Sequence, residues 1–432
     1  MRRPILFALL LVAALAATFP HAAAADGVFR PGELVVKRQG SPAAVERTKA
    51  GETLDQAIAR VRAQPGVESA APNPIARMTQ IPPAQPPAPW PNDPGPSGQP
   101  GGWKLTQWNF YGPASVNAAA AWGNVAKVGR TGGRGTVVAV LDTGVAYRDA
   151  GRFKRSPDFG PADFVRGYDF VGGDSHPDDE NGHGTHVAGT IGEGVNNGVG
   201  LTGLAYGAKI MPVRVLDSIG EGDVPVIARG VRYAARRGAD VINLSLEFSP
   251  EVTAGDIPEL LSAIRYARSR GTVVVGASGN EGHATVAYPA RAGDVLAVGA
   301  TTERGCLSDF SNEGRGLDIV APGGGRDAVT PVGEPGCDSA LPGRPIVQLT
   351  YTSGLGVFGY PDSYEGTSMA APHVAAAAAL VIASGVVGPH PTAEAVEKRL
   401  EATARDLGTP GYDERYGWGL LDAGAATAPA TG

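Results

Sequence analysis

The stretch that most constrains the fold is Gly366-Thr-Ser-Met-Ala-Ala-Pro-His-Val, which leads into small and apolar residues from Ala370 to Ala383. This unbroken run predicts a helix that is buried on all sides, and therefore a domain large enough to surround it. Ser368 lies at the start of the helix, where backbone N–H groups lack intrahelical partners and the helix dipole favours negative charge. The serine can therefore be a nucleophile beside a developing oxyanion, or simply an N-cap.

Two further stretches offer partners for such a nucleophile. Residues 137–144 are an apolar β-run that ends in Asp142 and a glycine turn, and residues 181–190 place His183 at the glycine-flanked start of another small-residue helix. Side chains in these positions can meet at one rim of an open α/β sheet. The order Asp142, His183, Ser368 is the subtilisin order, and all three motifs resemble those of the subtilisin-like (subtilase) serine peptidases. The resemblance runs from about Asn92 to Asp422.

The pattern of elements and the resemblance indicate the same fold class. Strands alternate with helices, which predicts an α/β fold with three layers and a mostly parallel, doubly wound sheet. We assign residues 107–427 to this subtilisin-like peptidase domain. The expected strands are 137–142, 209–215, 240–245, 272–276 and 294–300, and the expected helices are 224–237, 257–270, 370–383 and 392–406.

Three segments precede that domain. Residues 1–25 have the basic, apolar and small-residue parts of a signal peptide, so we expect a secreted protein, extracellular or periplasmic. Residues 26–80 contain two expected strands, 32–37 and 67–71, around a helix at 53–63 that Thr53 can cap. This small α+β unit resembles a shortened subtilase propeptide, which inhibits the enzyme and threads its tail through the active site; an unrelated extension is the alternative. Residues 81–106 are a proline- and glycine-rich linker and N-terminal arm.

Composition limits the partners. The net charge of −6 argues against binding to nucleic acid or anionic membranes, and no segment after the signal peptide reaches membrane length. We therefore expect a monomer whose partners are protein or peptide substrates and its own propeptide. The only cysteines, Cys306 and Cys337, are expected to form one disulfide in an oxidising compartment.

The resemblance implies a role for each catalytic residue. Ser368 would attack the peptide carbonyl, His183 would move the proton, and Asp142 would hold the tautomer of His183. Asn280, in the segment Ala277-Ser-Gly-Asn-Glu-Gly, would donate its amide to the oxyanion. His186 is expected to be structural, since the His-Glu-x-x-His pattern of zinc peptidases is absent.

The resemblance also implies a P1 pocket. Its walls would be Ser245, Leu246 and Glu247 on one side and Ala277, Ser278 and Gly279 on the other, with Ala287 at the floor. Glu247 departs from the family, which has glycine there. If Glu247 faces the cleft, it would attract a P1 lysine or arginine; if it faces outward, it is a solvated rim charge or pairs with a surface arginine. We expect an apolar P1 preference.

Calcium is the expected cofactor, as a structural ion only. The loop at 195–201 resembles the calcium loop of the family, with Asn197 and nearby carbonyls as oxygen ligands and Asp158 as carboxylate. Acids before the histidine motif could hold a second ion or form a solvated surface. The residues of the two expected sites are Asp158, Val195, Asn197, Val199 and Leu201 for the first, and Asp169 and Asp174 for the second.

The function that these features indicate is that of a secreted serine endopeptidase, which hydrolyses peptide bonds through an acyl-enzyme on Ser368 and is made as an autoprocessed zymogen. A transpeptidase or peptide cyclase could use the same acyl-enzyme, and a binding-only pseudoprotease is a further alternative. A lipase-type hydrolase is disfavoured because the serine motif lacks the second glycine of the nucleophile elbow.

Residues 323–360 are expected to form a surface excursion.

Overall fold

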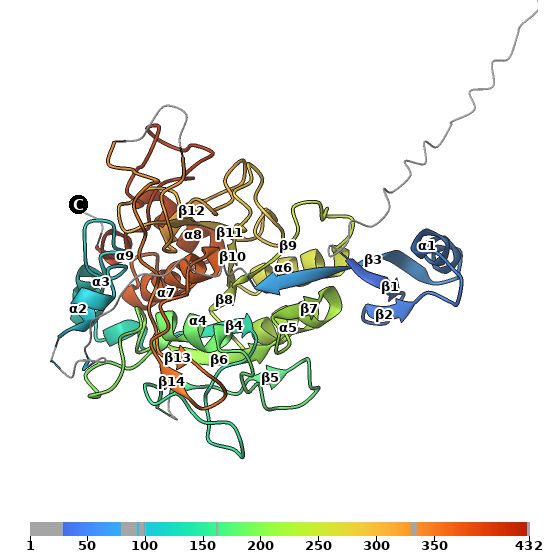
Figure 1. Cartoon of the computed structure of the whole chain (residues 1–432), viewed down its shortest axis with the longest axis horizontal. Helices are drawn as coiled ribbons and strands as arrows, with labels where there is room; N and C mark the ends of the chain where they lie inside the picture. The colour runs from blue at the N-terminus through green and yellow to red at the C-terminus, as the bar shows by residue number, and fades with distance from the viewer. Residues whose placement is uncertain are drawn as a thin grey trace, which may run out of the picture.

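A seven-stranded sheet forms the centre of the molecule (Figure 1). The computed structural model describes residues 29–78, 93–94, 99, 101–160, 163–329 and 335–429. The strand order is β12-β11-β10-β8-β4-β6-β5, and every neighbouring pair is parallel. The strands are β4 (Val137–Asp142), β5 (Tyr168–Asp169), β6 (Lys209–Arg214), β8 (Val241–Leu244), β10 (Val273–Ala277), β11 (Leu296–Thr301) and β12 (Ile319–Pro322).

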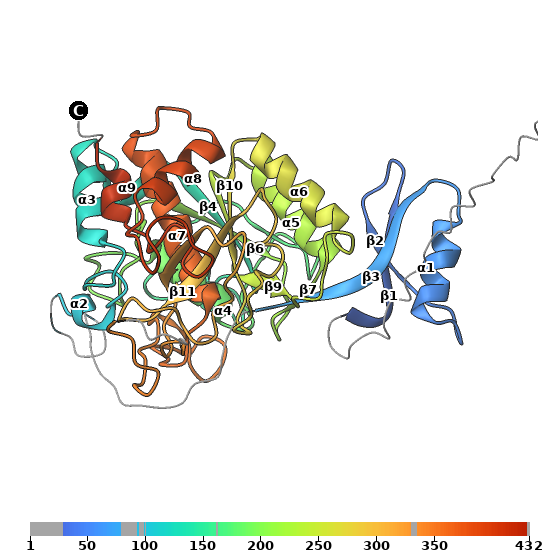
Figure 2. The same cartoon turned by 90° about the horizontal axis from the view of Figure 1, so that it is seen from above.

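Helices cover both faces of this sheet because its strands are apolar on both faces. In β4, Val138 and Val140 pack into one core with α7, whereas Ala139 and Leu141 pack into a second core on the opposite face. The predicted three-layer α/β fold is therefore confirmed (Figure 2). The first core contains residues of α3 (Ala118–Lys127), α4 (His183–Gly192), α7 (Thr367–Ser384), α8 (Ala393–Ala402) and α9 (Ala423–Thr427), and the second contains residues of α5 (Val224–Arg236) and α6 (Pro258–Ser269).

Helix α7 is the buried helix that its sequence predicts. Residues 367–381 are buried without a break, and the helix ends at Gly385, whose φ of 72° is the left-handed conformation that favours glycine. By length and composition α7 could cross a membrane, but most of it lies inside the protein core. Ser368 is the second residue of α7, the N-cap position belongs to Gly366, and no side chain caps this end. The N-cap interpretation of Ser368 is therefore wrong.

The N-terminal unit is a small sheet with one helix, and it contains β1 (Phe29–Arg38), β2 (Ala44–Arg47), α1 (Leu54–Arg62) and β3 (Val67–Met78). Strand β1 pairs antiparallel with both β2 and β3, and α1 packs on this sheet through a cluster that includes Leu34, Ile58 and Val61. Thr53 caps α1 as predicted, in a reciprocal capping box with Gln56. Strand β2 was not predicted. The predicted signal peptide and most of the predicted linker lie outside the described residues.

Strand β3 is much longer than the predicted strand at 67–71, because its second half pairs with the peptidase domain. Residues 75–78 lie antiparallel to β7 (Glu221–Asp223) on one side and to β9 (Leu246–Phe248) on the other. Figures 1 and 2 show β3 leaving the blue unit and reaching the larger domain. The N-terminal unit is thus joined to the domain by a continuous strand.

Candidate active site

The acid and the histidine come from neighbouring elements. Asp142 is the last residue of β4 and His183 is the first residue of α4. The His183 Nδ1 atom lies 2.8 Å from the Asp142 Oδ1 atom, and both side chains are fully buried. This approach needs Gly184, because a Cβ at that position would lie only 2.1 Å from the Gly144 carbonyl oxygen. The glycine beside the histidine therefore lets α4 begin directly against the end of β4.

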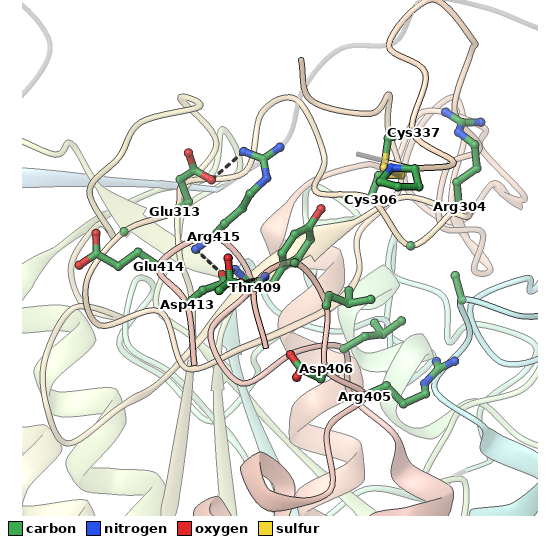
Figure 3. Close-up of a pocket in the computed structure, with 18 of the residues that line it drawn as sticks. Arg304, Cys306, Glu313, Cys337, Arg405, Asp406, Thr409, Asp413, Glu414 and Arg415 are labelled. Carbon is green, nitrogen blue, oxygen red and sulfur yellow. Dashed lines mark hydrogen bonds and ion pairs between the residues drawn. A yellow bond between two sulfur atoms is a disulfide. The ribbon is translucent and has the colours of Figure 1, made fainter. Parts of the chain in front are cut away.

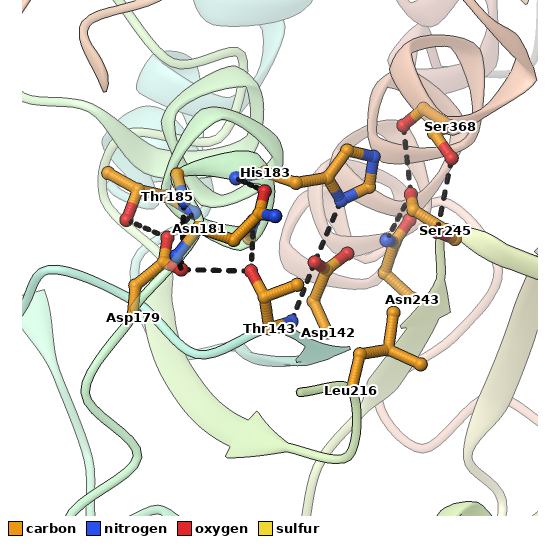
Figure 4. A network of polar contacts seen from close by, with 12 residues as sticks. Asp142, Thr143, Asp179, Asn181, His183, Thr185, Leu216, Asn243, Ser245 and Ser368 are labelled. Carbon is orange, nitrogen blue, oxygen red and sulfur yellow. Dashed lines mark hydrogen bonds and ion pairs between the residues drawn. The ribbon is translucent and has the colours of Figure 1, made fainter. Parts of the chain in front are cut away.

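Asp179 joins these two elements, a role that no sequence motif indicates. Its carboxylate accepts hydrogen bonds from Thr143 Oγ1 at 2.9 Å, Gly182 N at 2.9 Å and Thr185 Oγ1 at 2.6 Å (Figure 4). Thr143 follows Asp142, and Gly182 precedes His183. The buried Asp179 carboxylate thus fixes the strand end and the helix start relative to each other.

Ser368 lies on the opposite side of the His183 ring from Asp142 (Figure 4). Its hydroxyl donates to the Ser245 carbonyl at 3.1 Å, and the Ser245 hydroxyl donates to the Ser368 carbonyl at 2.8 Å. The Nε2 atom of His183 is buried and has no hydrogen-bond partner in the described part of the chain. If the Ser368 side chain rotates so that its hydroxyl donates to His183 Nε2 instead of the Ser245 carbonyl, Asp142, His183 and Ser368 form a hydrogen-bonded catalytic triad.

Asn280 is held in the orientation that an oxyanion donor needs. Its Oδ1 atom accepts from the Thr367 backbone N–H at 2.8 Å and from Thr367 Oγ1 at 3.1 Å. Its Nδ2 atom is buried and has no hydrogen-bond partner among the described residues. A buried amide group without a partner is uncommon in folded proteins and needs an explanation. Since Thr367 directly precedes Ser368, an oxygen that forms beside the serine would supply the missing acceptor.

His186 is structural, as expected. Its Nε2 atom bonds to the Ile346 carbonyl at 3.0 Å, and its ring stacks on Tyr364 with 4.1 Å between centroids. Full burial lowers the pKa of His186 to about 3, so the ring stays neutral. His186 therefore anchors α4 and does not compete with His183 as a base.

The expected surface excursion at 323–360 is only partly on the surface. Residues 338–342 are exposed, whereas Ile346 and residues 348–351 are buried. Thr350 Oγ1 donates to the Gly182 carbonyl at 2.6 Å. Thr350 and Tyr351 also form a short strand, β13 (Thr350–Tyr351), that pairs with β14 (Phe358–Gly359). Hydrogen bonds to the segment before His183 explain why this part of the excursion packs inward.

The segments expected to form the P1 pocket are neighbours in the structure. The Phe248 N–H in β9 donates to the Tyr288 carbonyl at 2.7 Å, and the Ala287 N–H donates to the Ser278 carbonyl at 2.8 Å. These bonds connect each of the two expected walls to the expected floor segment. Their members Ser245, Leu246, Ala277, Ser278 and Ala287 are all fully buried, and Glu247 is 7% exposed. The structure therefore excludes the interpretation of Glu247 as a solvated rim charge.

A separate hollow lies beside the disulfide (Figure 3). It has a volume of about 870 Å³, and none of the predicted catalytic residues lines it. Its walls include the predicted disulfide, which is present between Cys306 and Cys337, and an ion pair of 3.0 Å between Arg415 and Glu313. The hollow is thus distinct from the catalytic residues.

The first expected calcium site is a loop closed by a buried carboxylate. Asp158 lies under residues 195–201: its Oδ2 accepts from Leu201 N at 2.8 Å, and its Oδ1 contacts Asn197 Nδ2 at 2.6 Å. Burial raises the pKa of Asp158 to about 8. No lysine or arginine of the described residues pairs with it. Glu193, which the sequence analysis missed, adds a second buried carboxylate whose Oε2 has no partner within the described chain. The residues present therefore suit a hard cation.

The acids expected at a second calcium site have other partners. The Asp169 carboxylate pairs with Arg214 at 3.3 Å and accepts from Val171 N and Gly172 N, and Asp174 Oδ1 accepts from His176 N. Within the described ranges these acids do not gather into one ligand cluster. We therefore do not retain this second site.

The fold and the site together define the class of a subtilisin-like serine endopeptidase. The site consists of a buried acid–histidine pair beside a serine, and of an asparagine amide that has no hydrogen-bond partner among the described residues. Comparison with known proteins agrees. The model of the subtilase family, Peptidase_S8, matches residues 133–419. The chain belongs to the subtilase family.

Individual relatives cover much of the same region. Subtilisin Savinase of Lederbergia lenta is 40% identical over 295 residues, which are 68% of this chain and 91% of the relative. The cell wall-associated protease of Bacillus subtilis is 40% identical over 319 residues, and the match spans only 31% of that larger protein. A solved protease structure from Pseudoalteromonas arctica is 32% identical with a TM-score of 0.60, and the match covers 75% of this chain and 96% of that one.

Proposed function

We propose that this protein is a secreted endopeptidase that cleaves peptide bonds through an acyl-enzyme on Ser368. The observation that carries the proposal is that two buried nitrogens near the serine, His183 Nε2 and Asn280 Nδ2, have no hydrogen-bond partner among the described residues. One can accept the proton that the nucleophile loses, and the other can donate to the oxygen that becomes negative. A structural serine would require neither group.

The steps follow from these positions. The Ser368 Oγ atom bonds to the substrate carbonyl carbon while its proton passes to His183 Nε2, and Asp142 stabilises the imidazolium that forms. The carbonyl oxygen, now negative, accepts from Asn280 Nδ2 and from backbone N–H groups at the start of α7. The C–N bond then breaks, and His183 gives its proton to the leaving amine. Water attacks the ester by the reverse proton route, and releases the acid and the serine.

Labelling of the serine tests this proposal. A serine-directed phosphonylating reagent should inactivate the mature protein toward casein, and mass spectrometry should find one adduct, on Ser368. The hydroxyls of Ser245 and Ser278 serve as internal controls, because both are buried nearby and each already donates to a backbone carbonyl, that of Ser368 and that of Asn312 respectively. Casein hydrolysis that persists after complete labelling of Ser368, or a lack of any hydrolysis, contradicts the proposal.

We also propose that the N-terminal unit is a propeptide that the enzyme removes itself. The support is the pairing of residues 75–78 with β7 and β9, because an extended segment between two strands of the cleft occupies the place of a bound peptide. The wild-type protein should therefore be cleaved between about Arg77 and Thr106, and the chain just beyond β3 is the favoured place.

Expression of the precursor checks this prediction. Ser368→Ala should accumulate full-length precursor, which mass spectrometry of purified protein can measure. A trace of active wild-type enzyme added to the purified variant should restore cleavage and show that the precursor is accessible. If purified Ser368→Ala matures without added enzyme, self-processing is excluded.

We propose that calcium is held by Asp158, Asn197 and backbone carbonyls of the 195–201 loop, and that it neutralises the buried carboxylates there. Removal of calcium should lower the melting temperature by several degrees, since an ion that binds only the folded state stabilises it by about 2.7 kcal/mol at a hundredfold excess over Kd. Differential scanning calorimetry with chelator or with millimolar calcium measures the shift. Asp158→Asn should reduce the shift, whereas Asp174→Asn should leave it unchanged. An equal shift in both variants would place the ion elsewhere.

A further inference from the structure

The side chain of Glu247 crosses the space between the two walls expected to hold the P1 side chain. Its Oε2 accepts the Asn280 backbone N–H at 3.2 Å, so the carboxylate reaches from β9 to the opposite wall. A Cβ placed on Gly279 would lie 2.5 Å from the same oxygen, which shows how closely the carboxylate lies over that glycine. The side chain therefore lies within the pocket and not on its outer rim.

Strand geometry places Glu247 on the side of the nucleophile. Ser245 and Glu247 are two residues apart along an extended segment, and side chains at this spacing point to the same face. The Ser245 hydroxyl bonds to the Ser368 carbonyl, so this face is turned toward the start of α7. Glu247 is also the residue opposite Arg77 in the pairing of β9 with β3. A peptide in the place of β3 would therefore pass directly along this carboxylate.

The charge of Glu247 is not balanced by a cation among the described residues. The carboxylate is 7% exposed, and no lysine or arginine in the described portion of the chain forms an ion pair with it. Burial raises the pKa of Glu247 well above its usual range, and the neighbouring Glu281 adds to this effect. A buried carboxylate of this kind is costly unless a cation or further hydrogen bonds compensate it. Its hydrogen-bond donor among the described residues is the Asn280 backbone N–H, and the Asn312 side-chain amide and the Glu281 carboxylate lie nearby.

We infer that Glu247 is a specificity-determining residue, whose carboxylate receives the cationic side chain of an arginine or lysine at the P1 position of the substrate. This inference rests on the proposed endopeptidase function and replaces the expectation of an apolar P1 preference. Attraction between the two charges strengthens in a site from which water is excluded. A leucine or phenylalanine side chain would instead have to share the pocket with the carboxylate, which leaves that group desolvated without a partner.

The test compares peptides that differ only at P1, namely arginine, its neutral isostere citrulline, alanine and leucine. We expect kcat/KM for arginine to exceed that for citrulline and for leucine by about tenfold or more, a range that one buried polar contact can supply. Glu247→Gln keeps the size of the side chain and should bring the arginine-to-citrulline ratio near one. Glu247→Gly has the glycine of the family and should favour leucine. Glu414→Gln removes an exposed carboxylate away from the P1 walls and should leave all ratios unchanged.

Three outcomes would overturn the inference. An arginine-to-citrulline ratio near one in the wild type means that the charge is not used. A high ratio that persists in Glu247→Gln places the selectivity on another residue. A preference for alanine in both proteins means that Glu247 only fills the pocket. Titration of active sites with a phosphonylating reagent accompanies each measurement, because an absence of labelling and of all peptide hydrolysis would refute the proposed function rather than this inference.

Discussion

Ser368→Ala is expected to lower kcat on a good peptide substrate by about 10⁶, with little change in KM. Loss of the corresponding serine in subtilisin, a member of the same family, has an effect of this size. The reason is that this substitution removes the proposed nucleophile, so only attack by water, aided by the remaining donors, is left. The ratio of the two kcat values is measured in a continuous peptide assay. The assay compares the wild-type enzyme, whose active sites have been titrated, with the fully matured variant.

The control for this substitution must show that the fold is unaffected. Alanine at position 368 removes one hydroxyl, which donates to the Ser245 carbonyl, so the melting temperature should change little. Retention of more than about a thousandth of wild-type kcat in Ser368→Ala would exceed the activity that binding and the oxyanion donors alone provide, and would contradict the assignment of the nucleophile.

Asn280→Ala is expected to lower kcat by about 10²–10³, the effect of removing an oxyanion-hole amide from subtilisin. The structural reason is that Asn280 Nδ2 has no acceptor in the described structure and gains one only when the substrate oxygen becomes negative. Since that bond exists in the transition state and not with bound substrate, KM should change much less than kcat. Steady-state kinetics on one peptide separates the two constants.

A second substitution separates the donor role from a structural one. Asn280→Asp keeps an oxygen that can accept from Thr367 N and Thr367 Oγ1, but replaces the donating amide with an oxygen that repels the oxyanion. We expect a loss of kcat at least as large as in Asn280→Ala, without a loss of stability. If Asn280→Asp keeps near-normal kcat, the contribution of Asn280 is positional and the oxyanion donor lies elsewhere.

Local patterns in the sequence were sufficient to predict many of the helices, strands and catalytic motifs of the peptidase domain. The apolar run after Ser368 predicted a buried helix because a helix with no polar face can exist only inside a protein, and α7 is buried from Thr367 to Val381. Strand and helix patterns likewise predicted β4, β6, α5 and α6 to within a few residues. The Asp142, His183 and Ser368 motifs could be found because each depends on its own flanking residues.

Other predictions failed because their causes are not local. The extent of β3 depends on β7 and β9, which lie about 145 and 170 residues further along the chain. The inward packing of residues 346–351 depends on hydrogen bonds to α4 and to the segment before it. Asp169 and Asp174 were expected to bind calcium. Instead, the Asp169 carboxylate pairs with Arg214, and both carboxylates accept hydrogen bonds from backbone N–H groups.

The sequence by itself determined the α/β class, the order of the catalytic residues and the position of the nucleophile at a helix start, since these follow from periodicity and from short motifs. Only the tertiary structure decided which polar atoms remain without partners. His183 Nε2 and Asn280 Nδ2 have no hydrogen-bond partner among the described residues, and the Glu247 carboxylate accepts one backbone N–H but has no cation beside it there. Whether a buried group is satisfied depends on every segment packed against it, and those segments come from distant parts of the chain.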